Sequence, residues 1–305
     1  MTKHATLTAG VSLPALDLTN MLDEVIGIAQ LAGELLTVFY NNHLQSSIDV
    51  QTKDDTSPVT AADMAAHDLI EAALMTLTPD IPVLSEESAD VSERRLWQRF
   101  WLVDPLDGTR EFIKKTGEFT VNIALVEAGQ VVLGVLGVPL KAQIYAAIHA
   151  LDQTQSHANS PLRIAYRIEA DGSRVPLHSH PVSGKQLHTA MSRRALPPRY
   201  IAYQQQLTAA GWQLDIVNAG SAYKFCMMVD GNIDLYPRLH PTSEWDTAAG
   251  QCLLEVVGGA IVDLTGKPFR YNQRAELLNG SFIAVIDRAL LPALLPNAGT
   301  TESND

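Results

Sequence analysis

One stretch decides the architecture of this chain: Trp101-Leu102-Val103-Asp104-Pro105-Leu106-Asp107-Gly108-Thr109. Its leading apolar residues predict a buried strand, and the proline and glycine that follow predict a turn at the strand's end. Asp104 and Asp107 lie on this turn, with no Lys or Arg in the stretch before Arg110. The two carboxylates would therefore repel each other unless a cation lay between them. Carboxylate oxygens and a free backbone carbonyl are ligands that suit Mg²⁺.

A plain turn is the alternative for the same residues. Asp-Pro and Asp-Gly pairs form turns because aspartate bonds its own backbone and glycine accepts a positive φ. The stretch alone leaves both readings open, and the rest of the chain has to decide between them.

The composition is that of a globular protein with a sizeable core. The chain has 305 residues, of which 46% are hydrophobic and 18% charged, and its formal net charge is −12. This charge argues against electrostatic binding to nucleic acid or to an anionic membrane. Neither a signal peptide nor an apolar run long enough to cross a bilayer is expected from the sequence. Cys226 and Cys252 each lie in an apolar stretch, which predicts buried free thiols and a reducing, cytoplasmic compartment.

Alternating helical and strand patterns predict an α/β layered protein. Asn20 and Asp23 are the expected caps of the first helix. We expect an N-terminal α+β half over residues 1–150, a linker or insertion over 151–186, and a C-terminal α/β half over 187–305. The expected helices cover residues 18–39, 60–77, 199–210, 221–229 and 245–257, and the expected strands cover 82–84, 101–103, 120–126, 131–138, 188–192, 233–236 and 260–264.

Three further acidic positions accompany the aspartate turn. Glu86, with its neighbour Glu87, follows the strand at 82–84, where the alternative is a pair of solvated loop acids. Asp63 ends the run Thr60-Ala61-Ala62-Asp63, which also has the form of a capping box. Asp246 precedes an apolar helix in Trp245-Asp246-Thr247-Ala248-Ala249-Gly250, where an N-cap is the alternative.

Together these acids form the set that a metal-dependent phosphomonoesterase needs. Asp104 would bridge two ions, with Glu86 and the Leu106 carbonyl completing one shell and Asp107 and Asp246 the other. One ion would lower the pKa of a water and the second would stabilise the departing oxygen. The Thr109 hydroxyl, bonded to Asp63, would orient that water and accept its proton.

In order and spacing, these motifs resemble the inositol monophosphatase superfamily of lithium-sensitive, Mg²⁺-dependent phosphatases. Five shorter runs are similar to the bacterial bisphosphate nucleotidases within that superfamily. They are Ser57-Pro-Val-Thr-Ala-Ala-Asp63, Pro82-Val-Leu-Ser-Glu-Glu87, Gly117-Glu-Phe-Thr-Val-Asn-Ile-Ala124, Lys224-Phe-Cys226 and Tyr236-Pro-Arg238. The resemblance covers roughly residues 20–150 and 187–285.

The resemblance implies an αβαβα five-layer sandwich with the site between its two halves. It implies hydrolysis of 3'-phosphoadenosine 5'-phosphate, a by-product of sulfate assimilation, to AMP and phosphate, with two or three Mg²⁺ ions per site. The partner would be this small nucleotide rather than a nucleic acid. Some bacterial relatives lie at the inner face of the cytoplasmic membrane, and the sequence leaves that position and the oligomeric state open.

The resemblance also assigns roles to residues. The metal ligands would be Glu86, Asp104, Leu106 through its carbonyl, Asp107 and Asp246, and the catalytic pair would be Asp63 and Thr109. Substrate contacts would come from the metal-site residues Glu86, Leu106, Asp107 and Asp246, from the backbone of Gly108 and Thr109, and from Ser221, Lys224 and Arg238.

Arg238 stands about where inositol phosphatases place a carboxylate that binds sugar hydroxyls. A guanidinium favours a second phosphate over a bare polyol, so Arg238 is predicted to select a bisphosphorylated substrate. A surface ion pair is the alternative. Relatives often carry Ser-His at an adenosine-binding position where this chain has Ser192-Arg193-Arg194. Either one of these arginines contacts phosphate instead, or the base binds differently.

Two other functions remain open at this level. An inositol or sugar phosphatase would use the same chemistry on another substrate. A non-catalytic sensor of a phosphorylated metabolite would bind without turnover, but it has no need of the water-activating pair Asp63 and Thr109.

Overall fold

The computed structural model describes residues 16–45, 58–88, 92–150, 162–191 and 198–296. Within these ranges the chain builds a seven-stranded sheet in the order β1-β2-β3-β4-β5-β6-β7. Only β1 and β2 pair in parallel, and every later neighbour pairs antiparallel. The strands of this sheet are β1 (Val83–Ser85), β2 (Arg99–Asp107), β3 (Thr120–Glu127), β4 (Gln130–Val138), β5 (Gln143–His149), β6 (Arg163–Ile168) and β7 (Arg174–Pro176).

A second sheet has five strands in the order β12-β14-β10-β8-β9, and β11 and β13 form a separate pair. In the larger sheet β8 runs parallel to β9 and β10, while β14 is antiparallel to β10 and β12. These strands are β8 (Gln186–Met191), β9 (Gln213–Asn218), β10 (Leu235–Arg238), β11 (Thr242–Ser243), β12 (Ala260–Asp263), β13 (Leu278–Asn279) and β14 (Phe282–Val285).

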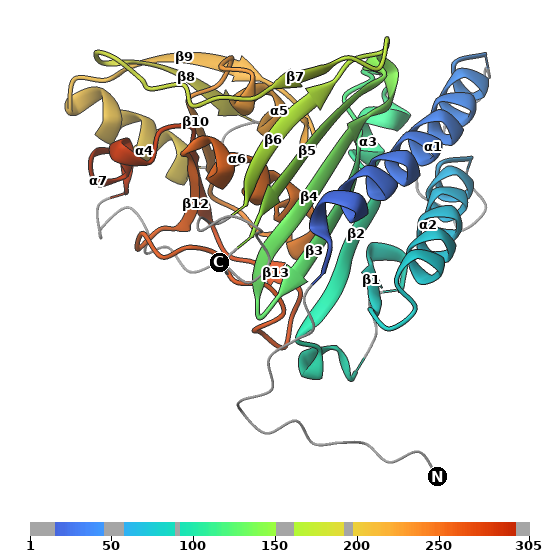
Figure 1. Cartoon of the computed structure of the whole chain (residues 1–305). Helices are drawn as coiled ribbons and strands as arrows, with labels where there is room; N and C mark the ends of the chain where they lie inside the picture. The colour runs from blue at the N-terminus through green and yellow to red at the C-terminus, as the bar shows by residue number, and fades with distance from the viewer. Residues whose placement is uncertain (1–15, 46–57, 89–91, 151–161, 192–197, 297–305) are drawn as a thin grey trace.

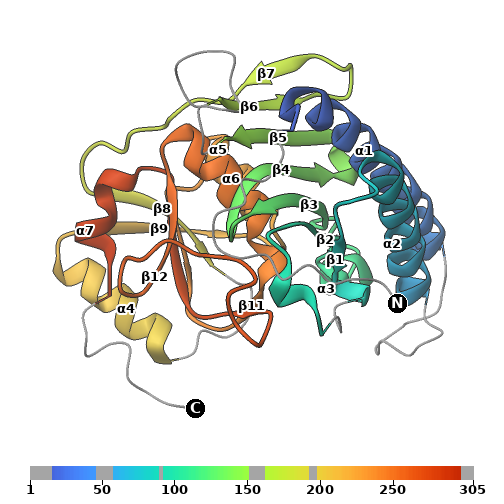
Figure 2. The same ribbon diagram turned by 60° about the horizontal axis from the view of Figure 1, so that its bottom comes forward.

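The helices complete five layers, as Figures 1 and 2 both show. α1 and α2 cover the outer face of the seven-stranded sheet, α5 and α6 lie between the two sheets, and α4 and α7 cover the outer face of the second sheet. The αβαβα sandwich expected from the resemblance is confirmed. The helices are α1 (Leu18–Gln45), α2 (Pro58–Leu77), α3 (Thr109–Ile113), α4 (Pro198–Ala209), α5 (Tyr223–Val229), α6 (Ala248–Val257) and α7 (Leu291–Leu294).

β2 shows why its sequence reads as a continuous apolar run. Trp101 and Val103 pack into the core beneath α1 and α2, whereas Phe100 and Leu102 pack into the core that contains α5 and α6. Successive side chains of a strand point to opposite faces, so a strand covered on both faces needs apolar residues at every position. This strand therefore carries its acidic end into the middle of the molecule.

All predicted helices and strands are present, although the first helix continues to Gln45. Its predicted caps were wrong. Asp17 caps the helix, because its carboxylate accepts hydrogen bonds from the backbone N–H of Asn20 (3.2 Å) and from the side chain of Asn20 (2.6 Å). Asp23 instead forms an exposed ion pair with Arg174 (2.7 Å).

The linker alternative for residues 151–186 was wrong where the structure describes the segment, whereas the insertion alternative stays a prediction. Residues 163–168 and 174–176 are β6 and β7, which extend the seven-stranded sheet. Many of their side chains are partly or fully exposed, and this explains why the segment lacks a strong apolar pattern. Residues 151–161 lie outside the described part of the chain.

Two smaller expectations concern the thiols and the membrane. Cys226 and Cys252 are both buried and free, as the sequence predicts. Across the described residues, every helix is too short or too polar to cross a membrane.

Candidate active site

Three carboxylates meet where β2 ends. Asp104 and Asp107 come from β2, and Asp246 comes from the 3-10 turn Glu244–Asp246 ahead of α6. One oxygen from each of the three carboxylates lies within 4.8 Å of the others. Asp104 is 1% exposed, and the other two side chains are partly buried. The chain thus brings together three acids that the sequence places in two distant segments.

A bulge in β2 allows the first two acids to converge. Asp104 pairs with Asn122 of β3 and Asp107 pairs with Thr120, so three steps along β2 match two steps along β3. In a regular strand, residues three apart point to opposite faces, and one extra residue brings them to the same side. The backbone N–H of Leu106 donates to Asp104 Oδ1 (3.0 Å) within this bulge. The turn predicted at Asp-Pro-Leu-Asp is therefore a bulge within β2, and the chain turns only at Gly108.

Burial and mutual repulsion raise the pKa values of the acids in the cluster. Burial raises the pKa of Asp104 well above its usual value, and the charges of Asp107, Glu86, Asp246 and Asp63 raise it further. Burial and the charge of Asp107 raise the pKa of Asp246 to about 8. Burial also raises the pKa of Asp107, against the opposing effect of Lys224. Since all the donors are oxygens, the set fits a hard divalent cation, which would relieve the repulsion.

Asp246 is held by its own local structure. Its Oδ2 atom accepts a hydrogen bond from the backbone N–H of Ser243 (3.0 Å), forming a capping box with the Ser243 side chain. The alternative that Asp246 is the N-cap of the following helix was wrong, because α6 begins at Ala248 and its N-cap is Thr247. Asp246 is the last residue of the 3-10 turn, and its carboxylate is fixed by the bond back to Ser243 while it contributes an oxygen to the cluster.

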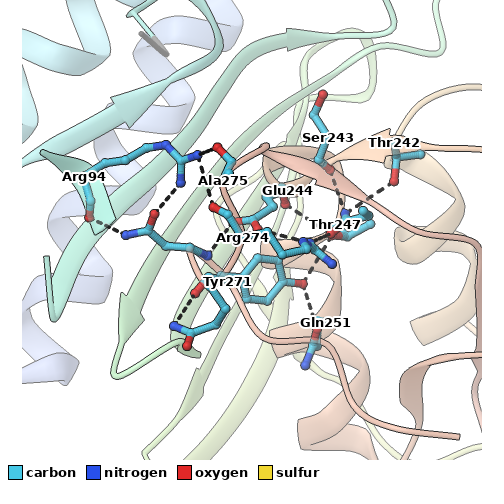
Figure 3. A network of polar contacts seen from close by, with 12 residues as sticks. Arg94, Thr242, Ser243, Glu244, Thr247, Gln251, Tyr271, Arg274 and Ala275 are labelled. Atoms are coloured by element: carbon cyan, nitrogen blue, oxygen red, sulfur yellow. Dashed lines mark hydrogen bonds and ion pairs between the residues drawn. The ribbon is translucent and has the colours of Figure 1, made fainter. Parts of the chain in front are cut away.

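A polar network surrounds this turn, and Figure 3 shows its members. Glu244 is fully buried and accepts hydrogen bonds from the backbone N–H of Asn272 (2.6 Å) and from the Arg274 guanidinium (3.1 Å). Asn279 donates to the Ser243 carbonyl and to the Thr247 hydroxyl, both at 2.8 Å. These contacts fix both ends of the turn that carries Asp246.

Arg94 joins the network from the 3-10 turn Arg94–Leu96, which lies between β1 and β2 in the chain. Its guanidinium donates to the Asn272 side chain (2.6 Å) and to the carbonyls of Arg274 (3.3 Å) and Ala275. The sequence interpretation missed both Arg94 and Glu244. The available signal was Ser243-Glu244-Trp245-Asp246, in which a second acid stands two residues before the predicted ligand.

The remaining predicted acids approach Asp104 from the first sheet and its helices. Asp63 is 1% exposed on α2, and Glu86 begins the 3-10 turn that directly follows β1. Because α2 begins at Pro58, Asp63 lies in the second turn of the helix, and the capping-box alternative with Thr60 as N-cap was wrong. The charges of Asp63 and Glu86 both raise the pKa of Asp104, which places them in the same electrostatic environment.

The turn after Asp107 begins α3. Gly108 has φ of 97°, a left-handed conformation that favours glycine, and it is the N-cap of the short helix. The predicted bond between the Thr109 hydroxyl and Asp63 was wrong, because the hydroxyl donates its hydrogen to the carbonyl of Leu106 (3.4 Å). Leu106 itself is fully buried, so its carbonyl is held beneath the turn together with Asp104.

A cavity of about 220 Å³ opens beside the cluster. Five of the predicted site residues line it, namely Asp107, Ser221, Lys224, Arg238 and Asp246. Lys224 is 3% exposed, and burial lowers its pKa to about 8. Its Nζ atom donates to the carbonyls of Ser221 (2.7 Å) and Ala219 (3.4 Å). Ser192, Arg193 and Arg194 lie outside the described residues.

Comparison with known proteins gives the fold and site a context. The model of the inositol monophosphatase family matches residues 17–297. A protein of Escherichia coli strain K12 named 3'(2'),5'-bisphosphate nucleotidase CysQ is 41% identical over 263 residues, covering 86% of this chain and 98% of that protein. The protein of the same name from Aggregatibacter actinomycetemcomitans is 37% identical over 269 residues, covering 87% of this chain and 92% of that protein.

Solved structures agree with these relatives. The crystal structure of CysQ from Bacteroides thetaiotaomicron superimposes with a TM-score of 0.71 at 33% identity, covering 87% of this chain and 97% of that one. Inositol monophosphatase II of Staphylococcus aureus superimposes with a TM-score of 0.70 at 20% identity, covering 90% and 93%, and shares the fold. The acid cluster thus stands on the scaffold of a known phosphatase family, and the chain belongs to the inositol monophosphatase family.

Proposed function

We propose that this protein is a Mg²⁺-dependent phosphomonoesterase that removes the 3'-phosphate of 3'-phosphoadenosine 5'-phosphate, giving AMP and phosphate. The observation that carries the proposal is that Arg238 lines the same cavity as Asp107 and Asp246. A cavity with a metal-binding acid cluster and a separate guanidinium matches a substrate with two phosphates. The nucleotidase names of relatives at 41% identity support the same substrate.

The metal ligands in this proposal are the oxygen donors at the end of β2 and around it. They are the carboxylates of Glu86, Asp104, Asp107 and Asp246 and the carbonyl of Leu106. Two or three Mg²⁺ ions bound there would lower the pKa of an attacking water and neutralise charge on the phosphate. The raised pKa values of Asp104 and Asp246 support cation binding, because bound cations would relieve the repulsion between the carboxylates.

Residues of the chain itself would position the phosphate and the water. The backbone N–H groups of Gly108 and Thr109 would hold phosphate oxygens at the turn, whose left-handed conformation at Gly108 favours glycine. Thr109 and Asp63 would orient the water and receive its proton. The burial of Asp63 supports this role. Few water molecules can reach a buried carboxylate, so the positioned water would be its proton donor.

Arg238 would bind the second phosphate. It is on β10 and donates to the Tyr236 hydroxyl (3.4 Å), while its buried Nε atom has no hydrogen-bond partner in the described residues. An unsatisfied buried donor is costly, and a phosphate oxygen would satisfy it. The predicted alternative of a surface ion pair fits this partly buried position poorly.

Phosphate release tests the proposal. Wild-type protein is assayed with 3'-phosphoadenosine 5'-phosphate and with inositol 1-phosphate, each with and without Mg²⁺, and Asp104→Asn serves as the inactive control. We expect Mg²⁺-dependent release from the nucleotide and much slower release from inositol 1-phosphate. Preference for inositol 1-phosphate would support the sugar-phosphatase alternative. Binding of the nucleotide without any release would support the sensor.

A further inference from the structure

The turn Ala219–Ala222, ahead of α5, lies directly against the end of β2. Gly220, Ser221 and Ala222 line the cavity beside the acid cluster. A Cβ atom placed on Gly108 would lie 3.1 Å from the Ser221 Cβ atom, so the two turns are in close contact. The position of Ser221 therefore sets the distance between this wall of the cavity and the turn that is proposed to bind phosphate.

Ser221 has an unusual backbone conformation. Its φ is +46°, in the left-handed region that residues with a side chain rarely adopt. Such a conformation persists only where surrounding contacts hold it in place. The neighbouring residue, Gly220, has no room for a side chain, because a Cβ atom there would lie 2.4 Å from the side chain of Glu111.

Four backbone groups of the turn are held by charged side chains. Glu118, just before β3, accepts the N–H of Gly220 (2.8 Å), and Asp107 accepts the N–H of Ala222. Lys224 holds the carbonyls of Ala219 and Ser221, as described above. One carboxylate at the end of β2 and one just before β3 thus fix two N–H donors of the turn, and an ammonium group from α5 fixes two of its carbonyl acceptors.

The Ser221 hydroxyl is a donor that the turn can offer to a ligand. The Ser221 Oγ atom accepts a hydrogen bond from the N–H of Tyr223 (3.1 Å), so the hydroxyl hydrogen can be donated into the cavity. The direction of that O–H bond depends on the conformation of Ser221, which the charged side chains maintain.

We propose that Glu118 is a positioning residue for substrate binding. It does not line the cavity, but it fixes the turn Ala219–Ala222 so that the Ser221 hydroxyl meets an oxygen of the phosphorylated substrate. The sequence run Gly117-Glu118-Phe119-Thr120 thereby gains a function beyond forming the start of β3. The kinetic part of the test rests on the proposed function, and the exchange part does not.

The kinetic test compares Glu118→Ala with Glu118→Gln. Loss of a charge-assisted hydrogen bond should raise KM for 3'-phosphoadenosine 5'-phosphate about 10-fold in Glu118→Ala, with kcat within about threefold of wild type. Glu118→Gln keeps an oxygen that can accept the Gly220 N–H, so its KM should stay within about threefold. Glu169→Ala is the matched control, because it also truncates a partly buried, hydrogen-bonded glutamate but lies on the loop after β6, away from the cavity. Equal KM values for Glu118→Ala and wild type would overturn the proposal.

A double-mutant cycle with Ser221→Ala tests whether Glu118 acts through Ser221. In the Ser221→Ala background, Glu118→Ala should raise KM by no more than about twofold, because the donor that it positions is already gone. Fully additive effects would assign Glu118 a role in general stability and overturn the proposal.

Amide hydrogen exchange tests the same idea without any substrate. In Glu118→Ala, protection should fall about 10-fold at Gly220 and also at Ala222, whose own hydrogen-bond partner is unchanged. Loss confined to Gly220 would show that Glu118 does not hold the turn. If wild-type protein releases no phosphate from the nucleotide, the proposed function fails, and the exchange experiment still decides the role of Glu118.

Discussion

The Oδ2 atom of Asp107 accepts a hydrogen bond from the backbone N–H of Ala222. This bond joins the acidic end of β2 to the turn that precedes α5, so a predicted metal ligand also anchors the opposite wall of the cavity. Asn122 donates to the same oxygen (3.4 Å). The orientation of this carboxylate is therefore fixed before any cation binds.

Asp107→Asn separates the two roles of this side chain. The amide oxygen can still accept the Ala222 N–H, so the melting temperature should change little, but the negative charge is lost. We expect Mg²⁺ affinity to fall by at least the 10- to 100-fold typical of a lost outer-sphere partner, with phosphatase activity falling at least as far. Isothermal titration with Mg²⁺ and phosphate release measure the two effects. Asp215→Asn, an exposed aspartate of β9, is the control and should behave as wild type.

The acid cluster predicts an unusual dependence of stability on pH. The pKa of Asp246 is about 8 in the folded protein, against 3.8 for an ordinary aspartate. Between these two pKa values the folded state binds more protons than the unfolded state. The free energy of unfolding of the metal-free protein should therefore fall as the pH rises from about 4 to about 8. Mg²⁺ replaces the protons, so its stabilising effect should be larger at pH 8 than at pH 6.

Thermal unfolding with EDTA and with Mg²⁺ at several pH values checks this. The Asp246→Asn variant removes one of the coupled acids and should show a flatter metal-free curve than wild type. An equal gain in melting temperature from Mg²⁺ at pH 6 and pH 8 would contradict the interpretation.

Arg238→Ala should change substrate choice more than catalysis of simple esters. Losing a charge-assisted contact to the second phosphate should raise KM for 3'-phosphoadenosine 5'-phosphate about 10- to 100-fold. Whatever slow release wild type shows from inositol 1-phosphate should change by less than about threefold, because that substrate has no second phosphate. Arg174→Ala, which removes an exposed arginine paired with Asp23, is the control. An equal loss of activity on both substrates would contradict this, because it would show that Arg238 maintains the structure or takes part in the reaction instead of selecting the substrate.

Two adjacent arginines offer a test of the network in Figure 3. Arg94 is 6% exposed and bound to the segment 272–275, whereas Arg95 is exposed. Arg94→Ala leaves buried acceptors without their donor and should lower the free energy of unfolding by about 2–4 kcal/mol. Arg95→Ala should stay within about 0.5 kcal/mol of wild type. Urea unfolding measures both, and similar values for the two variants would contradict the importance of the network.

Gly134 tests the contact between the first sheet and α6. A Cβ atom there would lie 2.8 Å from both the Ala249 carbonyl oxygen and the Cys252 Cβ atom, so Gly134→Ala forces α6 away from β4. We expect a loss of about 1–3 kcal/mol in the free energy of unfolding. Gly27→Ala on α1 meets no atom within 4 Å and should stabilise the protein by about 0.5–1 kcal/mol through helix propensity. Equal changes in the free energy of unfolding for the two variants would show that the close contact between β4 and α6 at Gly134 does not restrict the side chain.

The sequence by itself determined most of the helices, the first four strands of the seven-stranded sheet and the acids that stand at the ends of these elements. β2 was predicted because both of its faces are buried, and Asp104, Asp107 and Asp246 were singled out because turns and helix starts hold carboxylates in fixed places. Strands β6, β7 and β9 were not predicted, since many of their side chains are exposed and carry no regular apolar signal. Strands β5 and β14 were also not predicted, although they are mostly buried, because a short apolar run does not by itself distinguish a strand from a buried helical segment.

Only the tertiary structure decided what lies next to what. The bulge that turns Asp104 and Asp107 to one side depends on pairing with β3, and the hydrogen bonds from Gly220 to Glu118 and from Ala222 to Asp107 join segments about a hundred residues apart. The burial of Glu244 depends in the same way on the loop that carries Asn272 and Arg274. Local patterns report the propensity and burial of single elements, whereas contacts between distant segments depend on how complete layers pack.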